Sequence, residues 1–239
     1  MIKITCDTHT HTNVSQHAFS TLEENIAFAK RSGLEAIAVT NHGPSLGDGA
    51  GFMHFSSLRH LPPYINGLRV IKGAEVNITD EIGTLDIDNK LLHELELVIA
   101  SLHIPCFAPR EEEAVTRAWL NAMDNENIDI LGHLGDGRYK CDYEAVVRKA
   151  YEKRKAIEIN NHSFLVRPGS DVNCRKIALL CKKYSVPLVL STDAHFSGEI
   201  GIVPRSIELI EDINFPEELI LNTSLKKLCG FFAINEGDK

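Results

Sequence analysis

The sequence predicts an α/β fold made of a single domain, in which helices alternate with parallel strands that close into a barrel. Short apolar runs rich in β-branched residues recur along the chain, which is typical of buried parallel strands. Amphipathic helical patterns fill most of the gaps between these runs. Nearly every run ends in His, Asp, Glu or Asn, and only a barrel gathers all strand ends on one face.

The expected elements follow one another in regular order. Ser20 and Glu23 form a capping box at the start of the first helix, and Gly33 stops that helix. Further helices are expected at 111–125, 143–155 and 172–184, a small hairpin at 75–87, and two short helices within 216–233. Strands are expected at 2–6, 35–40, 68–73, 97–101, 128–131, 156–159 and 187–191.

Length and composition narrow the class of protein. The 239 residues contain no linker-like stretch, so we expect one domain over residues 1–239. The formal charge of −8 argues against a basic surface for nucleic acid. No run approaches the roughly 18 apolar residues of a membrane span, and the N-terminus does not resemble a signal peptide. We therefore expect a cytoplasmic protein with no membrane partner.

The cysteines do not point to disulfides or to a zinc finger. None of the six forms a C-x-x-C pair, which favours reduced thiols in a cytosolic protein. Cys6 belongs to a buried strand by its pattern, so we do not expect it to act as a nucleophile.

Histidine is the most informative residue type in the chain. His9 and His11 are two residues apart in an extended segment, so both rings can face one ion, and Asp193 and His195 repeat that spacing. A single His at a strand end is usually a structural residue, but many titratable groups buried on one face without a cation would be unstable. The candidate metal ligands are His9, His11, His17, His42, Glu75, His103, His133, Asp193 and His195. His54 and His162 lack this placement but could line the mouth of the site.

These motifs, in their order, resemble the PHP domain, a family named for polymerase and histidinol phosphatase. The resemblance extends over essentially the whole chain and is greatest to a short, stand-alone bacterial branch regarded as phosphatases. One departure is Asn41, since many relatives have Asp there, able to orient a ligand imidazole. The matching segments are 7–12, 40–44, 73–77, 101–103, 107–109, 132–133, 158–161 and 191–195.

The resemblance implies a distorted (β/α)7 barrel that holds three divalent ions. The first ion would be bound by His9, His11, Glu75 and Asp193, and Glu75 would bridge to the second. The preferred metal is Zn, with Mn or Fe as alternatives, because a mixed His and carboxylate site accepts all three. The second ion would also take His103 and His133, and the third would take His17, His42 and His195.

The implied chemistry is hydrolysis of phosphate esters by a metal-bound hydroxide, with Glu75 and Asp193 as catalytic residues. The leading interpretation is a phosphomonoesterase acting on a small phosphorylated metabolite. A phosphodiesterase or 3′-exonuclease, a non-catalytic metal-binding module and a C–N hydrolase are the alternatives. The resemblance also suggests a homo-oligomer.

The substrate contacts are less closely defined by the sequence. Arg138, Arg167 and Arg205 follow strands and could bind phosphate through the guanidinium group, although each also reads as a surface Arg. Phe52, His54 and Phe55 lie in the long loop after the second strand. They could form a lid or pack on the rim.

Overall fold

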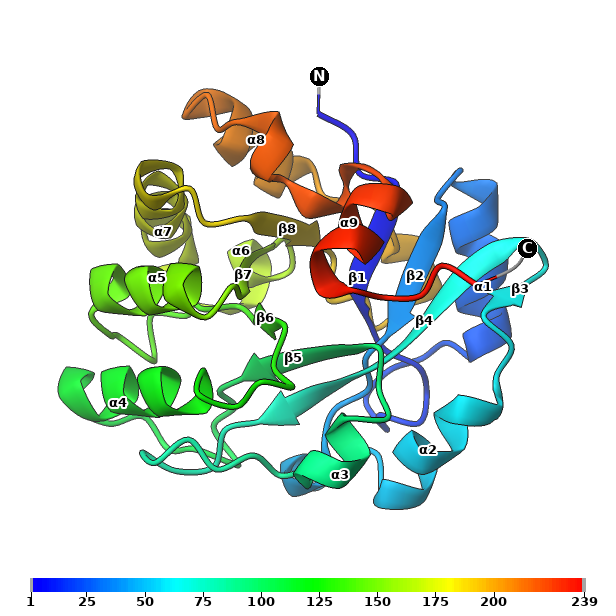
Figure 1. The fold of residues 1–239 in the computed structure, drawn as a ribbon, viewed down its shortest axis with the longest axis horizontal. Helices are drawn as coiled ribbons and strands as arrows, with labels where there is room; N and C mark the ends of the chain where they lie inside the picture. The colour runs from blue at the N-terminus through cyan, green and yellow to red at the C-terminus, as the bar shows by residue number, and fades with distance from the viewer. Residues whose placement is uncertain (1, 238–239) are drawn as a thin grey trace.

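The computed structural model describes residues 2–237 and contains a nearly closed barrel of seven parallel strands, which confirms the predicted fold class (Figure 1). A short eighth strand, β3 (Tyr64–Ile65), pairs antiparallel with β4 at the rim. The barrel strands, in spatial order, are β1 (Cys6–Thr10), β2 (Ala36–Val39), β4 (Leu68–Asn77), β5 (Leu97–Ser101), β6 (Ile130–Leu131), β7 (Ala156–Asn160) and β8 (Leu188–Ser191).

A polar seam replaces a full hydrogen-bonded ladder where β1 meets β8. The two ends are linked by a single parallel bridge between Thr10 and Ala194. Lower in the seam, the side-chain amide of Asn222 donates to the carbonyls of Cys6 (2.8 Å) and Leu190 (2.7 Å). The Asn222 side chain therefore satisfies backbone groups that a regular ladder would pair.

Apolar side chains pack against both faces of the barrel strands, inside and outside the barrel. The barrel interior is filled by small and branched side chains such as Ala36, Ala156 and Val189, and residues of α9 close its lower end. Outside the barrel, helices such as α4, with the buried Trp119, pack against the strands (Figure 1). The helices are α1 (Leu22–Arg31), α2 (Phe52–Ser57), α3 (Asn89–Leu92), α4 (Glu112–Ala122), α5 (Tyr143–Glu152), α6 (Ser163–Val166), α7 (Ser170–Tyr184), α8 (Pro204–Asp212) and α9 (Leu225–Phe232).

Several boundaries differ from the sequence prediction. The first strand begins at Cys6 rather than Ile2 and continues to Thr10, and β4 continues to Asn77. His9 and Glu75 therefore lie inside strands instead of after them. The predicted hairpin over 75–87 is reduced to one antiparallel bridge, between Ile78 and Leu85.

The ends of some helices also differ from the sequence prediction. Thr21 and Glu24 form the capping box of α1, not Ser20 and Glu23, because the Ser20 hydroxyl accepts a hydrogen bond from the Ser197 N–H instead. Gly33 does follow the helix, with a φ of +76° that glycine adopts without strain. The C-terminal segment contains one α-helix, α9, preceded by two 3₁₀ turns at 217–219 and 221–223.

None of the helices within residues 2–237 combines the length and apolar character that crossing a lipid bilayer requires.

Candidate metal centre

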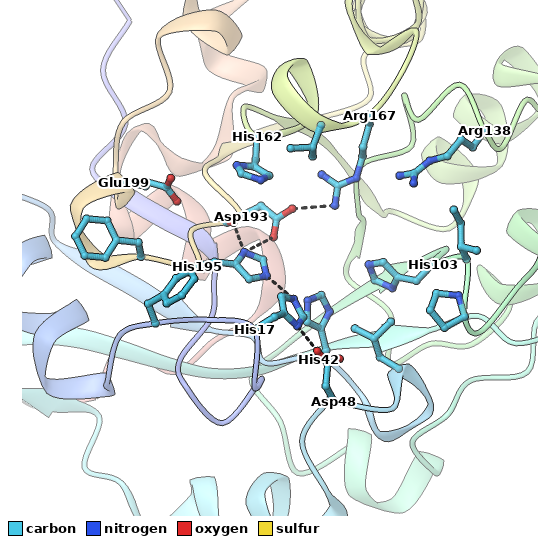
Figure 2. Close-up of a pocket in the computed structure, with 16 residues that line it drawn as sticks. His17, His42, Asp48, His103, Arg138, His162, Arg167, Asp193, His195 and Glu199 are labelled. Atoms are coloured by element: carbon cyan, nitrogen blue, oxygen red, sulfur yellow. Dashed lines mark hydrogen bonds and ion pairs between the residues drawn. The ribbon is translucent and has the colours of Figure 1, made fainter.

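The carboxyl ends of the barrel strands bring all nine predicted ligand side chains together. His9 and Glu75 project from β1 and β4, and the other residues follow strand ends or lie in the loop after β1. The site opens into a cavity of about 830 Å³ whose lining includes His17, His103 and His195 (Figure 2). The convergence predicted from strand ends is therefore present in the fold.

The deepest group consists of His9, His11, Glu75 and Asp193, all fully buried or nearly so. Their candidate ligand atoms lie within 4.8 Å of one another. His9 Nε2 is 3.3 Å from Glu75 Oε2 and 3.4 Å from Asp193 Oδ1. His11 Nε2 is 3.0 Å from the same Asp193 oxygen. Two carboxylates and two imidazoles thus face one point.

The other Glu75 oxygen, Oε1, faces a second set of imidazoles. It lies 2.9 Å from His133 Nε2 and 3.4 Å from His103 Nε2. The two ring nitrogens are themselves only 3.2 Å apart. Since each carboxylate oxygen of Glu75 faces a different set of histidines, this side chain can bridge two positions.

A third set lies nearer the solvent. His11, His42 and His195 place ligand atoms within 4.8 Å of one another. The Nε2 atoms of His17 and His195 are 2.9 Å apart, and the His17 side chain is more exposed than the rest of the cluster. His17 therefore extends the cluster toward the cavity mouth.

Buried polar atoms without hydrogen-bond partners indicate that the cluster can bind divalent cations. His9 Nε2, His42 Nδ1 and Glu75 Oε2 are buried and have no partner in hydrogen-bonding geometry. His42 Nδ1 nevertheless lies 2.6 Å from Glu75 Oε2. Buried polar atoms left without partners are unfavourable in a folded protein, and cations bound within the cluster would satisfy all three. Imidazole nitrogens with carboxylate oxygens suit first-row divalent metals.

Neighbouring positive groups keep the two carboxylates ionised despite their burial. Burial alone would raise the pKa of Glu75, but His42 and His9 hold it well below its usual range. Burial likewise opposes ionisation of Asp193, but His9 and Arg167 hold its pKa well below the ordinary value.

The histidines divide into two kinds. Burial lowers the pKa of His11, His42, His103 and His195, which favours the neutral rings that metal ligation requires. His9 is the exception, because the negative charges of Glu158, Glu75 and Asp193 outweigh burial and raise its pKa well above the usual value. The centre of the cluster thus favours positive charge.

A surrounding layer of acceptors orients the rings. Glu158 Oε1 lies 2.7 Å from His9 Nδ1, and its Oε2 accepts a hydrogen bond from the His133 N–H at 2.6 Å. Asn77 Oδ1 is 2.7 Å from His103 Nδ1, and Asp48 Oδ2 is 2.7 Å from His17 Nδ1. Such partners direct the opposite ring nitrogen toward the ligand position.

Sequence reasoning did not identify Glu158 or Asp48 as site residues. Glu158 carried a usable signal, since a carboxylate in the middle of a buried strand requires a partner. Asp48 lies between glycines in a long loop, where an acidic residue is ordinary and carries no such signal.

The backbone is strained at two residues of the cluster. His133 has a φ of +30° and Asp193 a φ of +57°, values that non-glycine residues adopt rarely. Residues held in such conformations concentrate at functional sites, where the surrounding structure over-determines them.

The three arginines occupy different environments. Arg167 lines the cavity and lies 3.0 Å from Asp193 Oδ2 through Nη2 (Figure 2). Arg138 also lines the cavity and is held by Asp136. The structure does not bring Arg205 to the cavity. Near the start of α8, it pairs with Asp171 at 2.6 Å instead.

The remaining candidates are placed as follows. His162 lines the cavity, whereas Phe52, His54 and Phe55 do not. Phe55 is buried on α2, which favours rim packing over a lid. Asn41 Oδ1 accepts from the Thr12 N–H at 2.8 Å, and its amide nitrogen lies 3.1 Å from His54 Nε2. Asn41 therefore supports the loop after β1 and contacts a histidine outside the cluster.

Comparison with known proteins agrees with this geometry. Residues 7–162 match the PHP domain family. A probable phosphatase of Acetivibrio thermocellus is 42% identical over 226 residues, covering 95% of this chain and 94% of that protein. A probable phosphatase of Caldanaerobacter subterraneus is 44% identical over 229 residues, covering 95% of this chain and 90% of that protein.

Among solved structures, the fold is similar to histidinol phosphate phosphatase from Lactococcus lactis in complex with zinc, L-histidinol and phosphate. The TM-score is 0.59 at 20% identity, and the match covers 89% of this chain and 94% of that chain. The family match across most of the chain and the close relatives along nearly its whole length lead to one conclusion: the chain belongs to the PHP domain family.

Proposed function

We propose that this chain is a metal-dependent phosphomonoesterase that acts on a small phosphorylated metabolite at a site for three divalent ions. The chain is a phosphatase of the PHP family, as its relatives' names along 95% of its length indicate. The choice of phosphomonoesters as substrates and the binding of three ions are proposed here in addition to that activity.

The observation that carries the proposal is the position of Glu75. Its two oxygens face separate groups of imidazoles, and its Oε2, His9 Nε2 and His42 Nδ1 are buried without a hydrogen-bond partner. We assign one ion to His9, His11, Glu75 and Asp193, and a second to Glu75, His103 and His133. His17, His42 and His195 would hold the third.

Divalent ions held there would offset the negative charge of a phosphoryl group and activate water for attack on phosphorus. Zinc is the preferred metal, with Mn and Fe as alternatives, and the solved histidinol phosphate phosphatase contains zinc. Glu75 and Asp193 would act as the catalytic carboxylates by holding this centre in place.

Arg167 and Arg138, which both line the cavity, would receive the phosphate oxygens. Arg167 is oriented by Asp193 and by the Ser163 hydroxyl, 3.1 Å from Nη1. Arg138 is oriented by a buried carboxylate, Asp136. Guanidinium groups fixed in this way can form paired hydrogen bonds to a phosphate.

A covalent route through cysteine is not supported. Cys6, on β1, is fully buried, and burial raises the pKa of its thiol to about 12. A protonated, inaccessible thiol is a poor nucleophile.

The test is release of inorganic phosphate from a panel of phosphomonoesters by protein reloaded with Zn or Mn. We expect Asp193→Ala and His103→Ala to lose bound metal and turnover together while circular dichroism remains unchanged. Asp171→Ala, which removes an exposed carboxylate paired with Arg205 away from the cavity, is the matched control. Unchanged turnover in Asp193→Ala after metal reloading would contradict the proposal.

The same assay separates the alternatives. Shortening of a single-stranded oligonucleotide without hydrolysis of monoesters would favour a phosphodiesterase. Bound metal with no hydrolysis of either class would favour a non-catalytic module.

A further inference from the structure

Two exposed phenylalanines lie at the mouth of the cavity on loops that also carry cluster residues. Phe19, in the loop after β1, is 80% exposed, and Phe196, directly after His195, is 54% exposed. Both side chains line the cavity, together with Ile104 and Val166. Exposed apolar side chains gathered around a polar site mark a binding surface more strongly than isolated ones do.

The loops that carry the two phenylalanines are joined to each other. The Phe19 N–H donates to the His195 carbonyl at 2.7 Å, and the Ser197 N–H donates to the Ser20 hydroxyl at 2.9 Å. The two aromatic side chains are therefore mounted on one connected wall of the cavity.

Gly198 sets the position of the Phe196 ring. A Cβ atom at Gly198 would lie 2.6 Å from Phe196 Cε1, closer than real contacts allow. The absence of a side chain at this residue is thus what allows the ring to lie against the backbone of the turn. Alanine at Gly198 would displace the ring while retaining it.

Charge varies across the cavity. Figure 2 shows Glu199 on the side of His195, and Arg138 and His103 on the opposite side. Among residues 2–237, no side chain forms a hydrogen bond or ion pair with the Glu199 carboxylate. An unpaired carboxylate at this end repels a second anionic group on the substrate.

We infer that Phe19, Phe196 and Glu199 form the leaving-group subsite, which selects phosphomonoesters of aromatic alcohols that carry no second acidic group. The inference rests on the proposed phosphomonoesterase activity and adds the substrate class. The phosphoryl group would occupy the Arg167 and Arg138 side, and the aromatic ring would pack against the two phenylalanines. Aromatic side chains favour such ring contacts beyond simple burial.

The test compares kcat/KM for three esters: benzyl phosphate, 4-carboxybenzyl phosphate and glycerol 2-phosphate. We expect benzyl phosphate to be preferred over each of the other two by about tenfold. Phe19→Ala and Phe196→Ala should each lower kcat/KM for benzyl phosphate by about 3- to 10-fold. The value for glycerol 2-phosphate should stay within about twofold.

Three further variants sharpen the assignment. Gly198→Ala should lower kcat/KM for benzyl phosphate as much as Phe196→Ala does, because the added methyl group displaces the Phe196 ring. Glu199→Gln should narrow the gap between 4-carboxybenzyl and benzyl phosphate. Phe52→Ala is the matched control, since Phe52 is 51% exposed on α2 but does not line the cavity.

A binding measurement gives a readout independent of turnover. Calorimetry should show that benzylphosphonate binds more tightly than methylphosphonate, and that Phe196→Ala removes this difference. Equal hydrolysis of all three esters, unaffected by Phe19→Ala and Phe196→Ala, would overturn the subsite and leave the phosphomonoesterase activity intact. No hydrolysis of any ester by metal-loaded protein would instead overturn the proposed function.

Discussion

Glu158 links the two halves of the cluster through a single buried carboxylate. Oε1 lies beside His9 Nδ1 and also accepts from the Ser191 hydroxyl. Oε2 accepts from the His133 N–H and from the Asn160 amide, the latter at 3.1 Å. Both oxygens thus face donors, and this environment requires a carboxylate rather than an amide.

Glu158→Gln should weaken metal binding by about 10- to 100-fold, the usual effect of removing a partner that orients a metal-ligating histidine. Either orientation of the glutamine amide would point an NH₂ group at existing donors. Metal content after dialysis against a graded chelator would measure the effect. Glu144→Gln, on the exposed face of α5, should bind metal like the parent, and equal affinity in both variants would contradict this role for Glu158.

The arginines illustrate the limit of reading single residues from a sequence. Arg167 and Arg205 both follow strands and looked equivalent. In the fold, Arg167 is largely buried beside Asp193, whereas Arg205 pairs with exposed Asp171. The direction of each side chain depends on short helices, α6 and α8, whose packing the local sequence does not specify.

At the scale of elements, the junction between β5 and β6 contains a partly buried ionisable group outside the metal centre. Asp129, just before β6, accepts a hydrogen bond from the Val98 N–H at 2.8 Å. Burial raises the pKa of Asp129 to about 7, although Val98 and Lys155 act against the shift. Lys155 binds the carbonyls that precede β6, including Glu126 O at 3.1 Å.

Asp129→Asn should therefore become progressively more stable than the parent as pH rises from about 4 to 7. The folded parent binds the Asp129 proton more tightly than the unfolded chain does, so the parent's free energy of unfolding decreases across this range. The asparagine variant has no such dependence and still offers an oxygen to the Val98 N–H. Urea denaturation of both proteins at pH 5.5 and 8 would measure the difference. A stability difference that does not change with pH would contradict the raised pKa.

Strand ends were harder to predict than strand centres. The prediction for β5 at 97–101 is confirmed residue for residue. β4 runs farther toward the cluster than expected because the polar Glu75 still pairs with Ile99 of β5. β1 likewise continues to Thr10, which pairs with Val39 beyond an irregularity that starts after Asp7. Inside a barrel, a polar side chain can point to the site while its backbone remains in the ladder, and apolar patterning does not detect this.

At the scale of the whole molecule, the barrel concentrates charge at one end and apolar packing at the other. Glu75, Asp193 and Glu158 are buried beneath the cavity. The lower end is closed by apolar residues of α9 such as Leu228. Bound cations would offset the buried negative charge, so metal binding and fold stability should be coupled.

Removal of metal by a chelator should lower the melting temperature by roughly 5–10 °C. This value applies when the free metal concentration before chelation is about 100 times the dissociation constant. The ions would bind the folded chain far better than the unfolded one, which lacks the assembled cluster. Calorimetry of metal-loaded and chelator-treated protein would measure the shift. Asp193→Ala should show little response to the chelator, and an unchanged melting temperature in the parent, with metal loss demonstrated, would contradict the coupling.

The domain span over residues 1–239 and the predicted homo-oligomer remain predictions. Sedimentation of the metal-loaded protein would establish the oligomeric state.

The sequence by itself determined the barrel class and the nine residues that converge at its open end. Strand periodicity is local, and the order of polar residues at strand ends follows directly from it. Only the tertiary structure decided how Glu158 lies against His9, 149 residues away in the chain, and which arginines face the cavity. It also joined the loops that carry Phe19 and Phe196. These contacts depend on loop paths and on the closure of the barrel, which are set by packing between distant segments and leave no periodic signal in the chain.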